Sequence, residues 1–146
     1  MSIFSAFNIN ASGMTAQRYR MDIISENVAN ANTTRTEDGT PYRRKVVTFE
    51  ERGGKVGTFS SFLDSAQADF MGVKVSKVAE DEWTQMNTVY DPSHPDADEN
   101  GYVTYPNVNI VTEMTNLIDA SRSYEANATA FNASKSIAIK GLEMSQ

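Results

Sequence analysis

Hydrophobic side chains recur every seven residues near the N-terminus of the chain. This stripe consists of Phe7, Met14, Met21 and Val28. Between residues 2 and 31 there is no proline and a single glycine, Gly13. Apolar positions spaced seven apart lie on one face of an α-helix. The pattern therefore predicts a long helix within residues 1–32 that has one apolar face.

The C-terminal part of the chain, residues 106–146, shows the same spacing. One stripe consists of Ile110, Leu117, Tyr124, Phe131 and Ala138, and a second stripe contains Met114, Ala128 and Leu142. Ser121 and Lys135 interrupt the second stripe. Pro106 and the asparagines that follow it are typical of a helix start, and Glu113 in the first turn favours the helix dipole. We expect a helix over residues 108–143.

The predicted C-terminal helix is longer than a compact protein of this size. At about 1.5 Å per residue it would span roughly 50 Å, whereas a globule of this chain length is about 40 Å across. We therefore expect the two terminal helices to pair as an antiparallel, coiled-coil-like hairpin and to pack against other chains. The residues predicted to pack between subunits are Phe7, Met14, Met21, Val28, Ile110, Met114, Leu117, Tyr124, Phe131 and Leu142.

The middle of the chain, residues 33–105, favours short strands and turns. β-prone or alternating runs predict strands over residues 45–49, 71–78 and 85–90. Gly53 and Gly54 indicate a turn, which makes residues 55–62 a candidate return strand. Residues 91–101 are rich in Pro, Asp and Asn, as loops are. The expected fold class is α+β: an inner helical domain from residues 1–32 and 106–146, and a small, mainly β middle domain.

Composition and charge exclude several classes of function. The 146 residues provide one modest domain, and the formal charge of −6 argues against nucleic-acid binding and against binding to anionic lipid. Cysteine is absent, which excludes disulfides, thiol catalysis and cysteine-ligated zinc. No apolar run approaches the roughly 20 residues of a membrane span, and no secretory signal pattern precedes Arg18. We expect a cytoplasmic protein or one exported by another route.

The sequence offers little that resembles a catalytic site. His94 is the single histidine, and it lies in an acidic loop without an evident orienting partner. We therefore interpret it as a solvated or hydrogen-bonded loop residue. The cluster formed by Arg43, Arg44 and Lys45 is too short for a nucleic-acid patch. Trp83 and the other aromatic residues are predicted to be core residues, and neither an enzymatic activity nor a cofactor is expected.

The acidic loop provides an alternative hypothesis. Residues 96–101 (DADENG) match the opening of a calcium-binding loop, with oxygen-bearing side chains at alternate positions and a glycine at the turn. The twelfth position, however, is Asn107 and not the bidentate glutamate that such loops require. An acidic Asn-Gly turn is the competing interpretation. A calcium-responsive binding module remains the alternative to a structural role, and calorimetry with calcium would separate them.

Several segments resemble the flagellar rod and hook family of bacteria. The N-terminal segments are residues 12–20 (SGMTAQRYR) and 27–35 (NVANANTTR), and the C-terminal segment is residues 121–127 (SRSYEAN). Three more are similar to the proximal-rod branch of the family: residues 41–45 (PYRRK), 91–103 (DPSHPDADENGYV) and 106–114 (PNVNIVTEM). The resemblance extends over nearly the whole chain, with less to recognise between residues 50 and 89.

The resemblance implies a structural subunit of the flagellar basal body. Such subunits form the tubular shaft that transmits torque from the rotor to the hook, and their paired terminal helices line the tube. Their partners would be further copies, other rod subunits and the flagellar type III export apparatus. Export by that apparatus would place the chain in the periplasm or cell-wall space without a cleavable signal peptide. Because the predicted helix faces are incomplete, we expect the terminal segments of the free monomer to be largely disordered.

Overall fold

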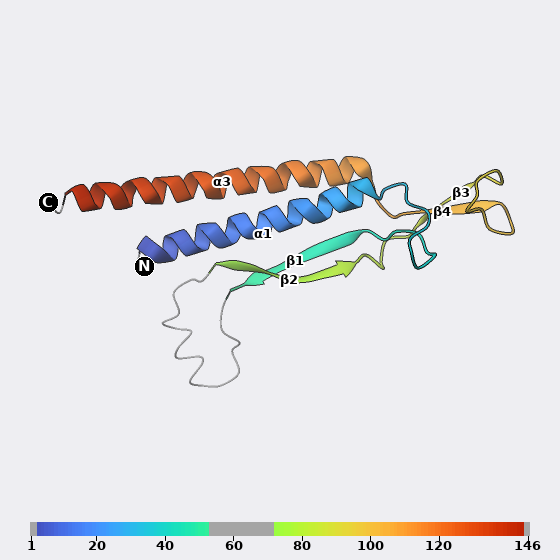
Figure 1. Ribbon diagram of the computed structural model, residues 1–146, viewed down its shortest axis with the longest axis horizontal. Coiled ribbons are helices and arrows are strands. Elements are labelled where there is room, and N and C mark those ends of the chain that lie inside the picture. Colours follow the sequence, from blue (N-terminus) through green and yellow to red (C-terminus); the bar gives the residue numbers. More distant parts are fainter. Residues whose placement is uncertain (1–2, 53–71, 145–146) are drawn as a thin grey trace, which may run out of the picture. The chain divides into compact units, whose positions relative to one another are not determined.

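A computed structural model describes residues 3–52 and 72–144 of the chain. Six elements follow one another in these residues: α1 (Ile3–Ala29), β1 (Lys45–Glu51), β2 (Val73–Glu80), β3 (Asn87–Tyr90), β4 (Tyr102–Tyr105) and α3 (Ile110–Glu143) (Figure 1). The α+β class predicted from the sequence is confirmed. The turn expected at Gly53 and Gly54 and the strand expected over residues 55–62 lie outside the described residues.

The chain divides into two compact units, and both helices contribute to each of them. Unit 1 comprises Met1–Tyr19, Thr48–Lys77 and Ala120–Gln146. Unit 2 comprises Arg20–Val47 and Val78–Asp119. Residues that are far apart in the sequence therefore meet within each unit.

The N-terminal end of α3 has the polar cap that the sequence led us to expect. The Asn109 side-chain oxygen accepts hydrogen bonds from the backbone N–H groups of Val111 (3.0 Å) and Thr112 (3.2 Å). These two donors have no partner inside the helix, so the asparagine supplies one. The 34 residues of α3 span about 51 Å. Among the described residues, no helix is both long and apolar enough to cross a membrane.

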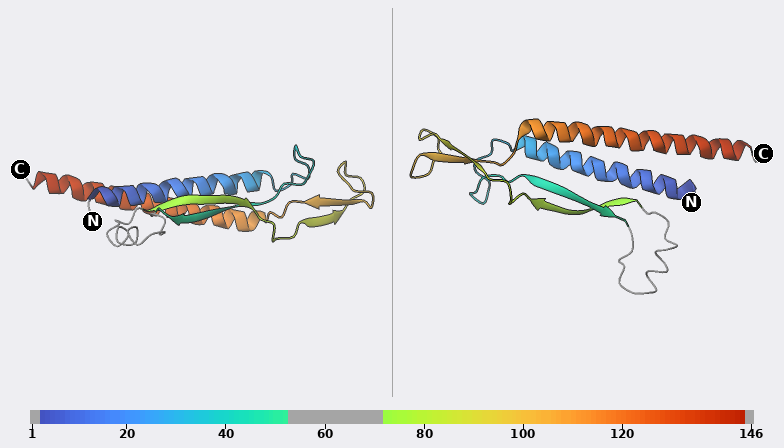
Figure 2. Two further views of the ribbon diagram at one scale, coloured as in Figure 1. Left: turned by 90° about the horizontal axis from the view of Figure 1, so that it is seen from below. Right: turned by 180° about the vertical axis from the view of Figure 1, so that it is seen from behind.

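In unit 1 the two helices run antiparallel (Figure 2). The rings of Phe7 and Phe131 lie 5.0 Å apart, centroid to centroid. Further along, a Cβ atom added to Gly13 would lie 2.8 Å from the side-chain oxygen of Asn127. Rising residue numbers on one helix thus meet falling numbers on the other. A larger residue at position 13 would force the Asn127 side chain to move.

A second close approach in unit 1 joins α1 to the start of β2. The Ser12 hydroxyl donates to the Ile9 carbonyl (2.7 Å) and accepts from the Val73 N–H (3.0 Å). Gly72, with φ +90°, has no room for a side chain, because an added Cβ would lie 2.1 Å from the Ser12 oxygen. Ser12 and Gly72 therefore fix the start of this strand on the helix.

The strands form two separate two-stranded sheets, β1 with β2 and β3 with β4. The β3–β4 pair is antiparallel, with Asn87 opposite Tyr105 and Tyr90 opposite Tyr102. Three of the four described strands were predicted: β1 is two residues longer than expected, β2 is shifted by two residues, and β3 is two residues shorter. β4 was not predicted, because its four residues directly continue a loop that is rich in turn-forming residues. The backbone hydrogen bonds of β4 are completed by β3, its partner in the sheet.

Candidate functional site

Four separate segments bring polar side chains together in the interior of unit 2. We call this cluster the polar junction: Asn27 from α1, Tyr42 and Arg44 from the segment before and at the start of β1, Asn107 before α3, and Glu113 in its first turn. Asn27 and Glu113 are each 1% exposed, and Tyr42 and Asn107 are also buried. Buried polar groups lower stability unless they are hydrogen-bonded, so the partners of each decide whether the cluster is tolerable.

Asn27 makes four hydrogen bonds through its side-chain amide. Its oxygen accepts from the Tyr42 hydroxyl (2.9 Å) and from the Lys45 N–H (2.8 Å). Its nitrogen donates to the Lys45 carbonyl (2.9 Å) and to the Glu113 carboxylate (3.1 Å). These partners distinguish the oxygen from the nitrogen, since both N–H groups and both acceptor sites are used. Aspartate or leucine could not make the same set.

Glu113 and Arg44 form the charged part of the polar junction. The Glu113 oxygen Oε1 accepts from Arg44 Nε (2.9 Å) and lies 2.8 Å from a terminal nitrogen of the same guanidinium. Two nitrogens of the guanidinium thus share one carboxylate oxygen, and Asn27 donates to the other oxygen, Oε2. A further nitrogen of Arg44 lies 3.4 Å from a carboxylate oxygen of Asp81. The buried Glu113 charge is therefore compensated on both of its oxygens.

Asn107 links the polar junction to the turn after β2. Its side-chain oxygen accepts from the Arg44 N–H (2.9 Å), and its nitrogen donates to the carbonyls of Asp81 (2.8 Å) and Thr84 (3.2 Å). The Asp81 carboxylate accepts from the N–H groups of Trp83 and Thr84 and from the Thr84 hydroxyl. Hydrogen bonds from Thr84 are the largest cause that lowers the pKa of Asp81.

The Asp81 turn also corrects our expectation for Trp83. We predicted a core residue, but Trp83 is 95% exposed. The turn explains the difference, because hydrogen bonds from the backbone of residues 83 and 84 to Asp81 hold this segment in a surface bend. A tryptophan is usually buried, but the local hydrogen bonds here outweigh that preference.

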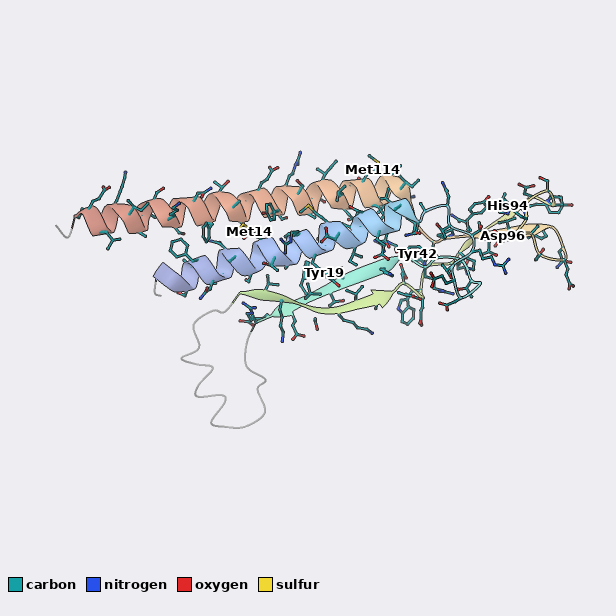
Figure 3. The ribbon with its side chains drawn as sticks, viewed as in Figure 1. Met14, Tyr19, Tyr42, His94, Asp96 and Met114 are labelled. Carbon is teal, nitrogen blue, oxygen red and sulfur yellow. The ribbon has the colours of Figure 1, made fainter. Side chains whose placement is uncertain are left out.

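Burial of Tyr42 shifts the pKa of its hydroxyl. Desolvation, followed by the negative charges of Glu26, Glu80 and Glu113, raises the pKa of Tyr42 to about 12. The hydroxyl thus stays protonated and can donate to Asn27 over the whole physiological range. Figure 3 shows Tyr42 between the end of α1 and the sheet. Its hydrogen bond to Asn27 links the segment before β1 to α1.

The acidic loop is folded by its own hydrogen bonds. Asp98 accepts from the N–H groups of Asn100 (2.9 Å) and Tyr102 (2.8 Å), and Asp96 accepts from the Thr34 hydroxyl (2.8 Å). Gly101 has φ +80° and its N–H donates to the Asp98 carbonyl (2.9 Å), so it closes a turn at a conformation that favours glycine. These contacts use one carboxylate oxygen of Asp96 and one of Asp98. Among the residues that the structure covers, no group of three or more acidic, histidine or cysteine side chains could hold a metal.

His94 is a hydrogen-bonded loop residue, as we interpreted it from the sequence. Its Nδ1 accepts from the Asp96 N–H (3.1 Å), and its ring lies 6.4 Å from that of Tyr105. Figure 3 shows His94 and Asp96 in the loop between the two strands of the β3–β4 hairpin. The imidazole therefore helps to shape the turn.

The residues predicted to pack between subunits fall into two groups. Three are exposed on α3: Ile110 at 42%, Met114 at 55% and Leu142 at 70%. The others are intermediate in burial: Phe7, Met14, Met21, Val28, Leu117, Tyr124 and Phe131. Phe7 and Phe131 already contact each other within the chain. Packing of these residues between chains stays a prediction.

The polar junction is the part of the site that sequence reasoning missed. Hydrophobic periodicity does not report a buried glutamate, and Glu113 was interpreted only as a favourable charge for the helix dipole. A signal was present, however, because all five residues of the polar junction lie within segments that carry the family resemblance: residues 27–35, 41–45 and 106–114. These segments, which are far apart in the sequence, meet in the polar junction.

Comparison with known proteins gives a consistent result. A family model described as flagella basal body rod protein matches residues 7–35, and one described as flagellar basal body rod FlgEFG protein C-terminal matches residues 99–144. The chain is 46% identical to the flagellar basal-body rod protein FlgC of Bacillus subtilis, over 99% of each chain. It is 44% identical to that of Borreliella burgdorferi, over 100% of this chain and 99% of the relative. Identity to that of Salmonella typhimurium is 39%, over both full lengths.

Proposed function

Since the chain belongs to the FlgC family of flagellar basal-body rod proteins, we propose that its terminal helices build it into the proximal rod. The chain is a structural rod subunit, and its place is the flagellar basal body. In the proposal it polymerises helically with further copies and with other rod subunits, and the assembled shaft transmits torque to the hook. The flagellar type III apparatus exports it to the periplasm or cell-wall space, and no catalytic step, nucleic acid or lipid is involved.

One observation carries the proposal: an apolar stripe on the solvent side of α3. Val111, Met114 and Ile118 are 75%, 55% and 53% exposed. Their spacing of three and four residues places them on one face of the helix. Figure 3 shows Met114 on the side of α3 that points away from α1. Exposed apolar residues aligned in this way are typical of a surface that another protein covers.

The helix architecture supports packing between chains. The most buried positions of α3 are Glu113 and Ala120, seven residues apart, and both face inward. The stripe of Val111, Met114 and Ile118 lies on another face of the helix and is thus free for a second contact. A helical polymer needs two different faces on each subunit. We propose that α1 and α3 pack in a coiled-coil-like manner within an inner domain of residues 1–32 and 106–146, and that the stripe forms one of the two intersubunit faces.

A charge placed on the stripe tests the proposal. In a bacterium whose own copy of the gene is deleted, Met114→Glu and Ile118→Glu should each reduce the amount of the chain in isolated basal bodies and reduce swimming. Loss of one buried side chain of this size weakens a contact by about 1.5–3 kcal/mol, which is roughly tenfold or more in an equilibrium constant.

Thr112→Glu is the matched control, because it adds the same charge to an exposed residue of α3 that lies off the stripe. This variant should assemble like the parent chain, and circular dichroism should show equal helix content in all three. Normal assembly and motility of both stripe variants would refute the role of this face.

A further inference from the structure

The two compact units carry opposite net charge. Unit 2 contains thirteen acidic and five basic residues, a formal charge of −8, whereas unit 1 contains six acidic and eight basic residues, a formal charge of +2. From residue 78 to residue 121 there are nine acidic residues and not one lysine or arginine. Complementary charge steers association and sets its orientation. A contact between unit 2 of one copy and unit 1 of another would therefore be favourable.

The end of the β3–β4 hairpin carries acidic and aromatic residues that would form the unit 2 side of this contact. Tyr90 and Tyr102 pair edge to face, with ring centroids 5.2 Å apart, and they are 64% and 45% exposed. Gly101 keeps the tip compact, because an added Cβ would meet the Tyr90 ring at 3.0 Å. Asp98 and Glu99 flank the pair and are both exposed. Exposed tyrosines beside carboxylates attract lysine and arginine side chains through cation–π and ionic contacts.

A groove in unit 1 offers the basic counterpart. It has a volume of about 320 Å³ and is lined by one face of α1 and by the ends of β1 and β2, with Tyr19, Arg52 and Lys74 among its residues. Arg52 is exposed. Lys74 is bonded to Glu50 at 2.7 Å, which makes Arg52 the cation more available to a partner. Ser12 and Val73 at the base hold the groove in place through their hydrogen bond.

We propose that the Tyr90–Tyr102 hairpin tip of one copy docks into the Arg52 groove of a second copy. The inference rests on the proposed rod function and names a contact that is distinct from the apolar stripe of α3. The hairpin end is acidic and aromatic, and the charged residues that line the groove, Arg52 and Lys74, are both cations, so the two surfaces are complementary in charge. Because one surface meets a different one, the contact is heterologous and can continue from copy to copy.

The absence of cysteine allows a direct test by cross-linking. Two differently tagged forms of the chain, Glu99→Cys and Arg52→Cys, are expressed together in a bacterium that lacks its own copy of the gene. A short bismaleimide is added to isolated basal bodies. We expect a mixed dimer that carries both tags. Glu37→Cys, which removes an exposed acidic residue in another loop of unit 2, replaces Glu99→Cys in the control and should give no mixed dimer.

A charge swap tests the same pair without a cross-linker. Glu99→Arg alone and Arg52→Glu alone should each lower the amount of chain in basal bodies, by about threefold for an exposed ion pair. The chain that carries both changes should recover, because the pair is restored with reversed sign.

The outcomes separate this inference from the proposed function. If both tagged forms are present in basal bodies but no mixed dimer forms, the docking contact is wrong and the rod function stands. A cross-link from Glu99→Cys to a different rod protein would equally overturn the choice of a second copy. If the parent chain itself does not enter basal bodies, the proposed function fails.

Discussion

Replacing Asn27 with alanine should destabilise unit 2 more than any other change of one asparagine in α1. The side chain is 1% exposed and makes four hydrogen bonds of 2.8–3.1 Å. Its loss leaves the Lys45 backbone groups and the Tyr42 hydroxyl without these partners. A buried group left unsatisfied costs about 1–3 kcal/mol. We expect a total loss of about 2–4 kcal/mol in the free energy of unfolding, a large share of the usual stability of a domain.

Urea unfolding followed by circular dichroism measures this loss. Tryptophan fluorescence is a poor probe here, because Trp83 is 95% exposed in the folded chain. Asn30→Ala is the control, since Asn30 directly follows α1 and its side chain makes only local hydrogen bonds. It donates to the Glu26 carbonyl (3.0 Å) and accepts from the Thr33 hydroxyl (3.1 Å). Its replacement should cost less than about 1 kcal/mol. If the free energy of unfolding falls with urea concentration at the same slope in both variants as in the parent chain, all three unfold in the same way.

Asn27→Asp separates hydrogen bonding from charge. The aspartate has nearly the same shape, but it places a second carboxyl group where the amide now donates to Glu113 at 3.1 Å. Two carboxylates this close cannot both ionise readily, so the folded state holds a proton with a raised pKa. The folded state then binds more protons than the unfolded state, and stability should fall as pH rises from 5 to 8. Equal stability of Asn27→Ala and Asn30→Ala, or no pH dependence of Asn27→Asp, would refute this account of the polar junction.

Three further predictions concern other contacts. Arg44→Met should cost about 3–5 kcal/mol in thermal or urea unfolding, because it leaves the buried Glu113 charge without its main partner; an effect below 1 kcal/mol would contradict the role of the pair. Gly72→Ala should destabilise far more than Gly39→Ala, since both have positive φ but only at Gly72 does an added Cβ collide with a serine hydroxyl; similar melting temperatures would argue against the close approach. Absorbance titration should show Tyr42 ionising near pH 12. Because this folded-state pKa lies above the unfolded value near 10, the stability that Tyr42 contributes should be full below pH 10 and lost between pH 10 and 12. Ionisation of Tyr42 near pH 10 would show that its hydroxyl is solvated.

The exposed stripe of α3 is a better place than the predicted packing residues to test contacts between subunits. Leu117 and Phe131 were both predicted to pack between subunits, yet Phe131 already contacts Phe7 in its own chain. A charge at Phe131 would therefore disturb the monomer as well as any polymer. Met114 and Ile118 face solvent and avoid that ambiguity. Hydrogen exchange on the monomer remains the test of our expectation that its terminal segments are largely disordered.

The sequence alone determined the elements that depend on local pattern. The seven-residue stripes placed both helices, because apolar spacing on a helix is a property of neighbouring residues. Pro106 and the asparagines after it placed the start of α3, because a helix cap is also local. The loop of residues 91–101 followed from its turn-forming composition. The family resemblance, carried by contiguous motifs, indicated a flagellar rod protein.

Only the tertiary structure decided which polar groups are buried and what they contact. Glu113, Asn27 and Arg44 look like surface residues in the sequence, and their burial depends on partners up to 86 residues away. Trp83 looked like a core residue, but the Asp81 turn exposes it. β4 exists because β3 lies beside it. For the polar junction and β4, the stabilising contacts join groups that are distant in the chain. The order of residues in the sequence does not show which distant groups lie close together in space.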